Sequence, residues 1–206
     1  VDNGLLEDSD FISFHTYGSV AEQESTVAAM RETERESGTR KFGIPYWITE
    51  SGKPRPYSGT SRGMTEPDLL SAVEIVGKAA EFRALGVERH FAFEYKFRKE
   101  NANNFGLMDF HQTPMRAMAA YTHLVRVLSH REYVGDLRGG DAFRARVFEG
   151  EKDLVAVLYN GRGDHRKAWT SLPKGLRVIR ATGIDGRPLS VRNGKVSCAD
   201  GIAYVY

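Results

Sequence analysis

The sequence predicts an α/β fold for its first part and an all-β module for its last part. Between residues 10 and 128, apolar strand-like runs alternate three times with segments that favour helix. This alternation predicts parallel strands joined by crossover helices. Past Ser129, short strand-like runs are separated by glycine-rich or polar turns, which is typical of a small antiparallel sandwich. We therefore divide the chain into residues 1–129 and 130–206.

The first strand-and-helix unit begins with the apolar run at residues 10–18. The two-residue period of a strand puts His15 and Tyr17 on one face, near the end of this strand. Residues 20–37 contain neither glycine nor proline, so they predict a helix that Gly38 ends.

The second unit supplies the stretch around which the rest is organised. Residues 44–49 are rich in β-branched and aromatic side chains and are followed by Glu50. This pattern predicts a buried parallel strand with a carboxylate at its C-terminal end, where α/β barrels have their active sites. Such a carboxylate is a candidate nucleophile, general base or metal ligand, and capping of the next turn is an equally good interpretation. The long loop that follows contains Tyr57, and Thr65 is the expected N-cap of a helix that Gly86 ends.

The third unit predicts a strand over residues 87–95, with Glu94 and Tyr95 at its end. A polar loop follows at residues 96–104. Pro114 then opens a helix that we expect to continue to Leu128, because Pro is favoured at the first turn of a helix.

In the all-β module, apolar runs and turn signals define the strands. The candidate strands are residues 142–149, 153–160, 176–182 and 202–206. Asp185-Gly186 and Asn193-Gly194 are dipeptides that favour tight hairpins. We expect this module to pack on the last helix of the preceding part.

Composition excludes several classes of function. The 206 residues are 41% hydrophobic and 27% charged with a net charge of +2, which gives no case for nucleic acid or an anionic membrane surface. The single cysteine, Cys198, excludes an intrachain disulfide and a cysteine metal cluster. No run approaches the ~20 apolar residues that span a bilayer, and the acidic first residues do not form a signal peptide. Because the chain begins with Val1, we expect it to be trimmed or cut from something longer, and its compartment stays open, with a secreted or periplasmic location favoured.

Five segments together resemble the C-terminal half of a clan A retaining glycoside hydrolase. They are residues 10–18 (DFISFHTYG), 45–52 (PYWITESG), 93–95 (FEY), 104–109 (NFGLMD), and 119–121 (AAY) in the helix that Pro114 opens. In this clan the fold is a TIM (β/α)8 barrel, and the segments are similar to its sixth, seventh and eighth strands and their helices. A β-sandwich after the barrel is common in the clan, for example among relatives of the family 39 xylosidases.

The resemblance implies that Glu50 is the catalytic nucleophile. The retaining mechanism also needs an acid/base carboxyl about 5–5.5 Å away, which in the clan follows an asparagine at the end of strand four. That strand is absent here, and no Asn-Glu pair occurs in the sequence. Glu94 is on the neighbouring strand rather than the opposite wall. We therefore expect this chain to carry the nucleophile half of the site, to be inactive alone, and to need the missing N-terminal half of the barrel as its partner.

The resemblance also nominates residues that bind the substrate. His15 and Tyr17 are similar to clan residues that line the sugar subsite and hydrogen-bond the nucleophile, although both could simply fill the core. Trp47 is a further candidate, but its mid-strand position favours packing.

The end of the third strand and its loop offer further candidates. Glu94 and Tyr95 fall where the clan has a sugar-stacking aromatic, usually Trp, so this chain departs from the pattern, and Glu94 could instead pair with a nearby cation. Asn103 could reach a sugar or cap a turn. No His/Asp cluster has metal-ligand spacing, so neither a metal nor another cofactor is implied.

The sequence thus predicts a retaining glycoside hydrolase that acts on poly- or oligosaccharides, with the sugar and linkage open. One alternative is a non-catalytic carbohydrate-binding or structural fragment that lacks the acid/base residue. Another makes the all-β module the functional part, with Tyr159, Trp169 and Tyr204 as aromatic platforms, although strand cores use the same residues.

Overall fold

The computed structural model describes residues 6–38, 43–56, 65–137, 143–160, 168–173, 175–198 and 200–206, without the side chains of Thr65 and Ala168. Up to residue 129 the elements are β1 (Ile12–His15), α1 (Val20–Glu36), β2 (Tyr46–Ser51), β3 (Arg55–Pro56), α2 (Thr65–Ala84), β4 (Arg89–Ala92), β5 (Lys99–Glu100), β6 (Asn103–Asn104) and α3 (Arg116–Leu128). After it come β7 (Glu132–Asp136), β8 (Phe143–Glu149), β9 (Leu154–Asn160), β10 (Ala168–Ser171), β11 (Ala181–Thr182), β12 (Val191–Arg192), β13 (Lys195–Cys198) and β14 (Ile202–Val205). Tyr57, which the sequence places in the long loop after Glu50, lies outside the described residues.

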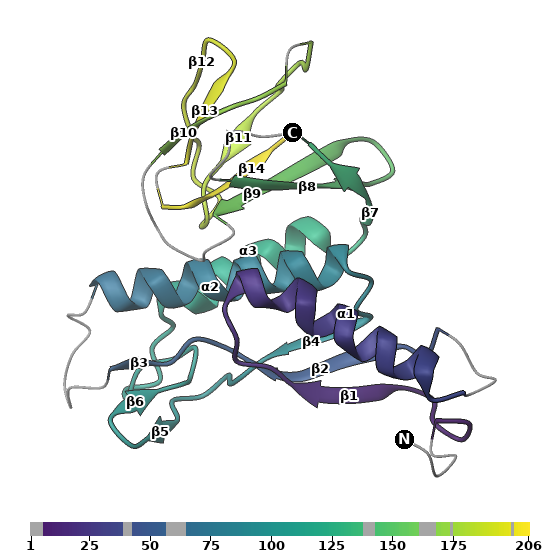
Figure 1. The fold of residues 1–206 in the computed structure, drawn as a ribbon. Helices are drawn as coiled ribbons and strands as arrows, with labels where there is room; N and C mark the ends of the chain where they lie inside the picture. The colour runs from purple at the N-terminus through teal and green to yellow at the C-terminus, as the bar shows by residue number, and fades with distance from the viewer. Residues whose placement is uncertain are drawn as a thin grey trace.

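A parallel sheet holds the three strands that the sequence predicts in the first part. Its order is β1-β2-β4, and Trp47 in β2 pairs with Ser13 on one side and with Arg89 on the other. Figure 1 shows the helices on one side of this sheet, between it and the all-β module. Because the strands are parallel, their C-terminal ends meet at one edge. Within the described residues the sheet ends at β1 and β4, so it does not close into a barrel.

The helices pack on the sheet against every second side chain of β2. Tyr46 and Ile48 are buried against Val27 of α1 and Phe82 of α2. The middle of α2 is buried all round, because the helix also packs on the all-β module. A helix in that position has apolar side chains on several faces, and the charged side chains that it also buries, such as Lys78 and Glu81, have polar partners.

The third strand is shorter than the sequence predicts. β4 ends at Ala92, and the amide of Phe93 makes the last bond to β2, at 2.8 Å to the Ser51 carbonyl oxygen. The backbone of Glu94 instead pairs with the returning chain: its amide donates to Phe105, and its carbonyl accepts from Leu107 at 2.7 Å. The predicted strand over residues 87–95 is therefore wrong at its end, and Glu94 lies beyond the sheet.

The all-β module contains two antiparallel sheets, one in the order β11-β14-β9-β8-β7 and one in the order β10-β13-β12. Side chains from both sheets share an apolar cluster that includes Phe143, Leu158, Val196 and Ala203. The hairpin predicted at Asn193-Gly194 is confirmed, because both residues have positive φ angles, 50° and 69°, and join β12 to β13.

Other strands of this module differ from the prediction. The candidate strand at 176–182 is mostly wrong: only Ala181–Thr182 joins a ladder, and the side chain of Ile179 is 75% exposed. Strands β7, β10, β12 and β13 were not predicted as strands, because polar residues break their alternation.

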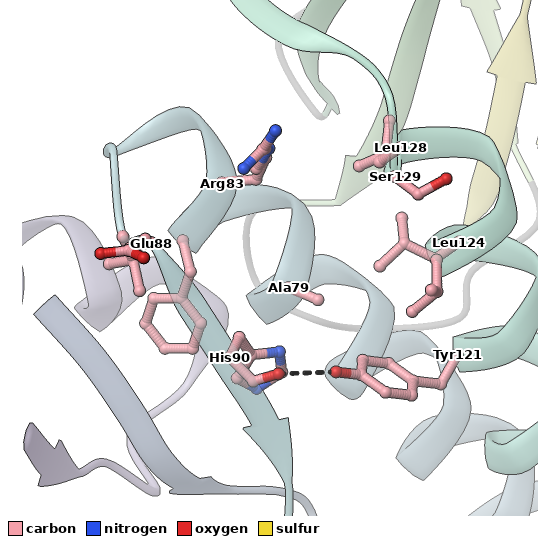
Figure 2. A pocket seen from close by; sticks show the side chains of 11 residues that line it. Ala79, Arg83, Glu88, His90, Tyr121, Leu124, Leu128 and Ser129 are labelled. Carbon is pink, nitrogen blue, oxygen red and sulfur yellow. Dashed lines mark hydrogen bonds between the residues drawn. The ribbon is translucent and has the colours of Figure 1, made fainter. Parts of the chain in front are cut away.

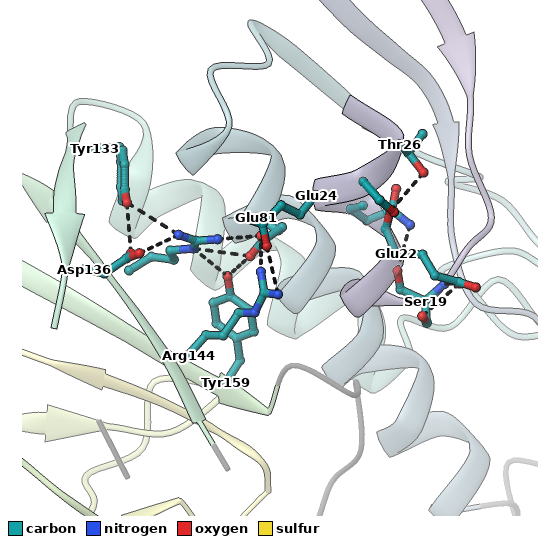
Figure 3. A network of polar contacts seen from close by, with 12 residues as sticks. Ser19, Glu22, Glu24, Thr26, Glu81, Tyr133, Asp136, Arg144 and Tyr159 are labelled. Atoms are coloured by element: carbon teal, nitrogen blue, oxygen red, sulfur yellow. Dashed lines mark hydrogen bonds and ion pairs between the residues drawn. The ribbon is translucent and has the colours of Figure 1, made fainter. Parts of the chain in front are cut away.

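A buried ion network joins α2 to the all-β module (Figure 3). The carboxylate of Glu81 is fully buried and contacts Arg144 at 2.5 Å, Arg146 at 2.6 Å and the hydroxyl of Tyr159. Asp136 of β7 extends the network, since it lies 2.7 Å from Arg146. The parts of the chain on either side of Ser129 therefore share one network and one apolar core, and their division into two domains stays a prediction.

Two cavities flank His90 of β4. One of about 170 Å³ lies between α2, β4 and α3, where the hydroxyl of Tyr121 donates a 2.9 Å hydrogen bond to the carbonyl oxygen of His90 (Figure 2). The other, of about 480 Å³, is lined by His90 together with Phe91, Leu107 and Met118. In the part of the chain that the structure describes, no helix is long and apolar enough to cross a membrane.

Candidate active site

The ends of β1 and β2 bring together residues that are far apart in sequence. His15 is the last residue of β1, and Glu50 is the last but one of β2. The two pair in the ladder after a register shift between Phe14 and His15. The amide of Thr16 then bonds to the carbonyl oxygen of Glu50 at 3.0 Å, which closes the ladder at this edge.

Two side chains from the end of β1 contact the same oxygen of the Glu50 carboxylate. The hydroxyl of Tyr17 donates to Oε2 at 2.8 Å, and Nδ1 of His15 lies 3.3 Å from the same atom. Among the described residues, Oε1 accepts no hydrogen bond. Because the Glu50 side chain is 30% exposed and that of His15 is 54% exposed, the carboxylate is open to a ligand on this side.

The environment of Tyr17 keeps it a neutral donor. Burial raises the pKa of its hydroxyl, and the hydrogen bond to Glu50 raises it further, with smaller effects from the carboxylates of Glu100 and Glu94. Edge-to-face contacts with Phe93 and Phe105, at ring centroid distances of 6.2 and 6.0 Å, hold the ring. Tyr17 therefore remains protonated and donates its hydroxyl hydrogen to Glu50.

Close approach of β2 to the end of β4 depends on Gly52. A Cβ atom at this position would lie 2.7 Å from the carbonyl oxygen of Phe93, which is backbone and cannot give way cheaply. Gly106 permits a second close approach, to the loop after β4, since a Cβ there would lie 1.8 Å from the carbonyl oxygen of Lys96. Gly52 thus allows Phe93, whose ring contacts Tyr17, to lie close to the site.

Trp47 lies three residues before Glu50, on the opposite face of β2 from Tyr46 and Ile48. Its ring stacks on Phe11 at 4.0 Å, and Phe91 lies at 6.3 Å. Its indole nitrogen is buried and has no hydrogen-bond partner among the described residues. A sugar contact for Trp47 stays a prediction, and the contacts present are packing contacts.

The other predicted binding residues lie in the turns after β4. Glu94 affects the pKa of Tyr17, so it lies near the site. Tyr95 is 56% exposed and lines the larger cavity beside β4. Asn103 is held in β6, where it pairs with Pro56 and Glu100. A contact with substrate stays a prediction for all three.

Asn104 and Phe105 also belong to the surroundings of Tyr17, because the ring of Phe105 contacts it. The side-chain oxygen of Asn104 accepts hydrogen bonds from the amides of Arg98 and Gly106, so this residue shapes the turn that carries Phe105. In the sequence, Asn104 and Phe105 belong to the Asn-Phe-Gly-Leu segment that resembles the glycoside hydrolases. No pattern indicated Lys78, a buried residue of α2 that contacts both strand ends.

The described residues do not complete a hydrolytic site. At the ends of β1, β2 and β4 they offer no carboxylate on a wall opposite Glu50. They also contain no group of three or more His, Cys, Asp or Glu side chains arranged to hold a metal ion.

Comparison with known proteins gives a likeness in structure. No protein-family model matches the chain, and no curated protein sequence is similar to it. A family 39 glycoside hydrolase from Bacteroides cellulosilyticus matches 87% of this chain with a TM-score of 0.62 and 15% identity. Two family 30 enzymes follow: a subfamily 8 xylanase from Clostridium acetobutylicum (99% of this chain, TM-score 0.53, 12% identity) and an endoxylanase from Clostridium papyrosolvens (97%, 0.55, 13%).

The matched region covers only part of each of these structures. The chain spans 37% of the family 39 protein, and 53% and 49% of the two family 30 enzymes. This coverage is consistent with the resemblance to a C-terminal portion. The chain therefore has the fold of one part of a clan A glycoside hydrolase.

Proposed function

We propose that this chain carries the nucleophile half of the active site of a retaining glycoside hydrolase that acts on poly- or oligosaccharides. One observation carries the proposal: Glu50, at the C-terminal edge of a parallel sheet, has one carboxylate oxygen held by Tyr17 at 2.8 Å and approached by His15 at 3.3 Å. A carboxylate held in one orientation at that edge is what a barrel glycosidase needs as its nucleophile.

The chemistry uses the two oxygens of Glu50 differently. Tyr17 and His15 orient the carboxylate through Oε2, and Oε1 attacks the anomeric carbon of the sugar. A glycosyl ester forms as the bond to the leaving oxygen breaks, and an acid/base carboxyl gives that oxygen its proton. Water then attacks the anomeric carbon, gives a proton to the same acid/base group, and releases Glu50.

The acid/base group and the rest of the barrel come from a partner, the N-terminal half of the fold. The exposed face of the parallel sheet supports this proposal, because Phe11 and Phe91 are 42% and 46% exposed on either side of Trp47. The buried, unpaired indole nitrogen of Trp47 also fits a face that further strands would cover. In this proposal β1 and β4 pair with added strands to close an eight-stranded barrel, and the all-β module is its C-terminal β-sandwich.

Substitution of Glu50 tests the proposal in the protein at its full natural length. Glu50→Gln keeps the shape of the side chain and removes the nucleophile, so hydrolysis of aryl β-xylosides and β-glucosides should fall roughly 10⁴-fold or more. Glu132→Gln is the control: it makes the same chemical change at an exposed residue of β7 in the all-β module and should keep most of the activity. With Glu50→Ala, added azide should restore turnover and give a glycosyl azide of inverted configuration.

Retained turnover in Glu50→Gln would overturn the nucleophile assignment. If the parent protein itself hydrolyses none of these glycosides yet binds an oligosaccharide, a non-catalytic carbohydrate-binding protein would replace the hydrolase.

A further inference from the structure

Lys78 is a fully buried lysine on the helix that lies behind the candidate site. It belongs to α2, and its side chain is 0% exposed. Its Nζ donates to the carbonyl oxygen of Gly52 at 2.9 Å and to that of Tyr17 at 3.4 Å. Glu74, one turn earlier on the same helix, has a carboxylate oxygen 3.5 Å from the same nitrogen.

Burial of the charged Lys78 side chain has an unfavourable effect on the free energy of folding. Burial lowers the pKa of Lys78, and Glu74 opposes that change. Burial likewise raises the pKa of Glu74, and Lys78 is the largest influence in the other direction. An apolar pair of similar volume would often be at least as stable, so the contacts that Lys78 makes with the strand ends need a reason other than stability.

The two carbonyl groups lie where the sheet no longer holds the backbone. The bond from Thr16 to Glu50 is the last between β1 and β2, and Tyr17 and Gly52 come after it in their respective chains. Tyr17 donates to the Glu50 carboxylate, and Gly52 follows Glu50 by two residues. Lys78 thus links the ends of β1 and β2 beyond the last backbone hydrogen bond between these two strands.

We propose that Lys78 is a positioning residue for the nucleophile: by holding the carbonyl groups of Tyr17 and Gly52, it fixes the hydrogen bond from the Tyr17 hydroxyl to Glu50. The role rests on the proposed function, and it goes beyond that function because Lys78 touches neither the carboxylate nor the substrate.

The test compares variants of the protein at its full natural length. Lys78→Met keeps the length of the side chain and removes its charge and donors. Glu74→Gln/Lys78→Met also removes the carboxylate that would be left buried, and it replaces the single variant if that fails to fold. Ser71→Ala is the control: it removes another donor of α2 to a loop carbonyl, that of Lys53 at 2.8 Å, without touching Tyr17.

We expect kcat on an aryl glycoside to fall about 10- to 100-fold in the Lys78 variants, because a small misplacement of a reacting group has an effect of this size. KM should change less than about threefold, and Ser71→Ala should match the parent. Since Lys78 acts through Tyr17, adding Lys78→Met to Tyr17→Phe should lower kcat less than about twofold further. Losses that multiply in the double variant, or an unchanged kcat, would overturn the role of Lys78.

A crystal structure of the Lys78 variant provides a readout that is independent of activity. The distance from the Tyr17 hydroxyl to Glu50 Oε2 should exceed the hydrogen-bonding range in the variant, and an unchanged 2.8 Å would contradict the proposal. The Glu50→Gln measurement separates the two claims. Full activity of Glu50→Gln would contradict the proposed function. If Glu50→Gln is inactive but the Lys78 variants keep their activity and geometry, only the role of Lys78 is contradicted.

Discussion

At the scale of residues, the contact between Tyr17 and Glu50 follows from where two parallel strands end. The period of two along residues 10–18 was enough to predict that His15 and Tyr17 share a face, and the position of Glu50 after an apolar run predicted its place at the strand end. Lys78 could not be predicted in this way. A lysine in a helix usually extends into solvent, and only the packing of α2 between two layers buries this one.

His90 gives a residue-scale prediction about pH. Both ring nitrogens are buried without a hydrogen-bond partner among the described residues, and burial lowers the pKa of His90 to about 3. An unfolded histidine has a pKa of about 6.5. Between these values the unfolded chain binds a proton that the folded chain does not, so stability is lost as the pH falls from about 6.5 towards 3.

The measurement is chemical denaturation at pH 7 and pH 5 of the parent and of His90→Phe, which keeps an aromatic ring between Phe82 and Tyr121. The parent should lose about 2 kcal/mol more than the variant over this interval. His130→Gln changes an exposed histidine and should leave the difference unaltered. Equal losses in the parent and His90→Phe would show that His90 titrates normally.

At the scale of elements, apolar runs predicted the strands and helices that form the site, and they failed where the chain turns. α1, α2 and α3 are present close to their expected limits, because Gly38, Gly86 and Pro114 mark where these helices end or begin. The end of β4 was wrong because Glu94 pairs with a segment that arrives later in the chain. The pairing partner of a strand end is a property of the tertiary fold, which a local pattern does not contain.

Gly52 links these elements to the site and can be tested by adding one methyl group. In Gly52→Ala the new Cβ would lie 2.7 Å from the Phe93 carbonyl oxygen, so β2 and the end of β4 must separate. We expect a loss of about 1–3 kcal/mol in the free energy of unfolding and a fall in activity. Gly183→Ala is the matched control, because its Cβ would have no neighbour closer than 3.5 Å. Equal stability of the two variants would contradict the close approach.

At the scale of the whole molecule, the ion network around Glu81 connects the helices to the all-β module (Figure 3). From the sequence we expected the module to pack on the last helix of the preceding part, but not that a charge lies at the junction. A glutamate on a helix and two arginines on a strand are each ordinary on a surface. Only the docking of the two parts buries them together.

Glu81→Gln should therefore weaken the connection between the two parts. Removing one charge of a buried network leaves Arg144 and Arg146 with less compensation, and we expect a loss of about 3 kcal/mol in calorimetric unfolding. The control is Arg35→Ala, which removes an exposed pair with Glu32 and should change stability by less than about 1 kcal/mol. A loss of the same size in both variants would mean that the network does not hold the parts together.

The central claim is that Glu50 is a nucleophile, and covalent trapping tests it most directly. A 2-deoxy-2-fluoro-glycoside with a dinitrophenolate leaving group needs no proton donor for departure, so its reaction depends on the nucleophile and not on the acid/base group. Incubation with the full-length protein should form an ester between the sugar and the Glu50 carboxylate, and peptide mass spectrometry should find the label on Glu50 and none in Glu50→Gln. A label on another carboxylate, such as Glu94, or unlabelled protein that still hydrolyses glycosides, would contradict the account.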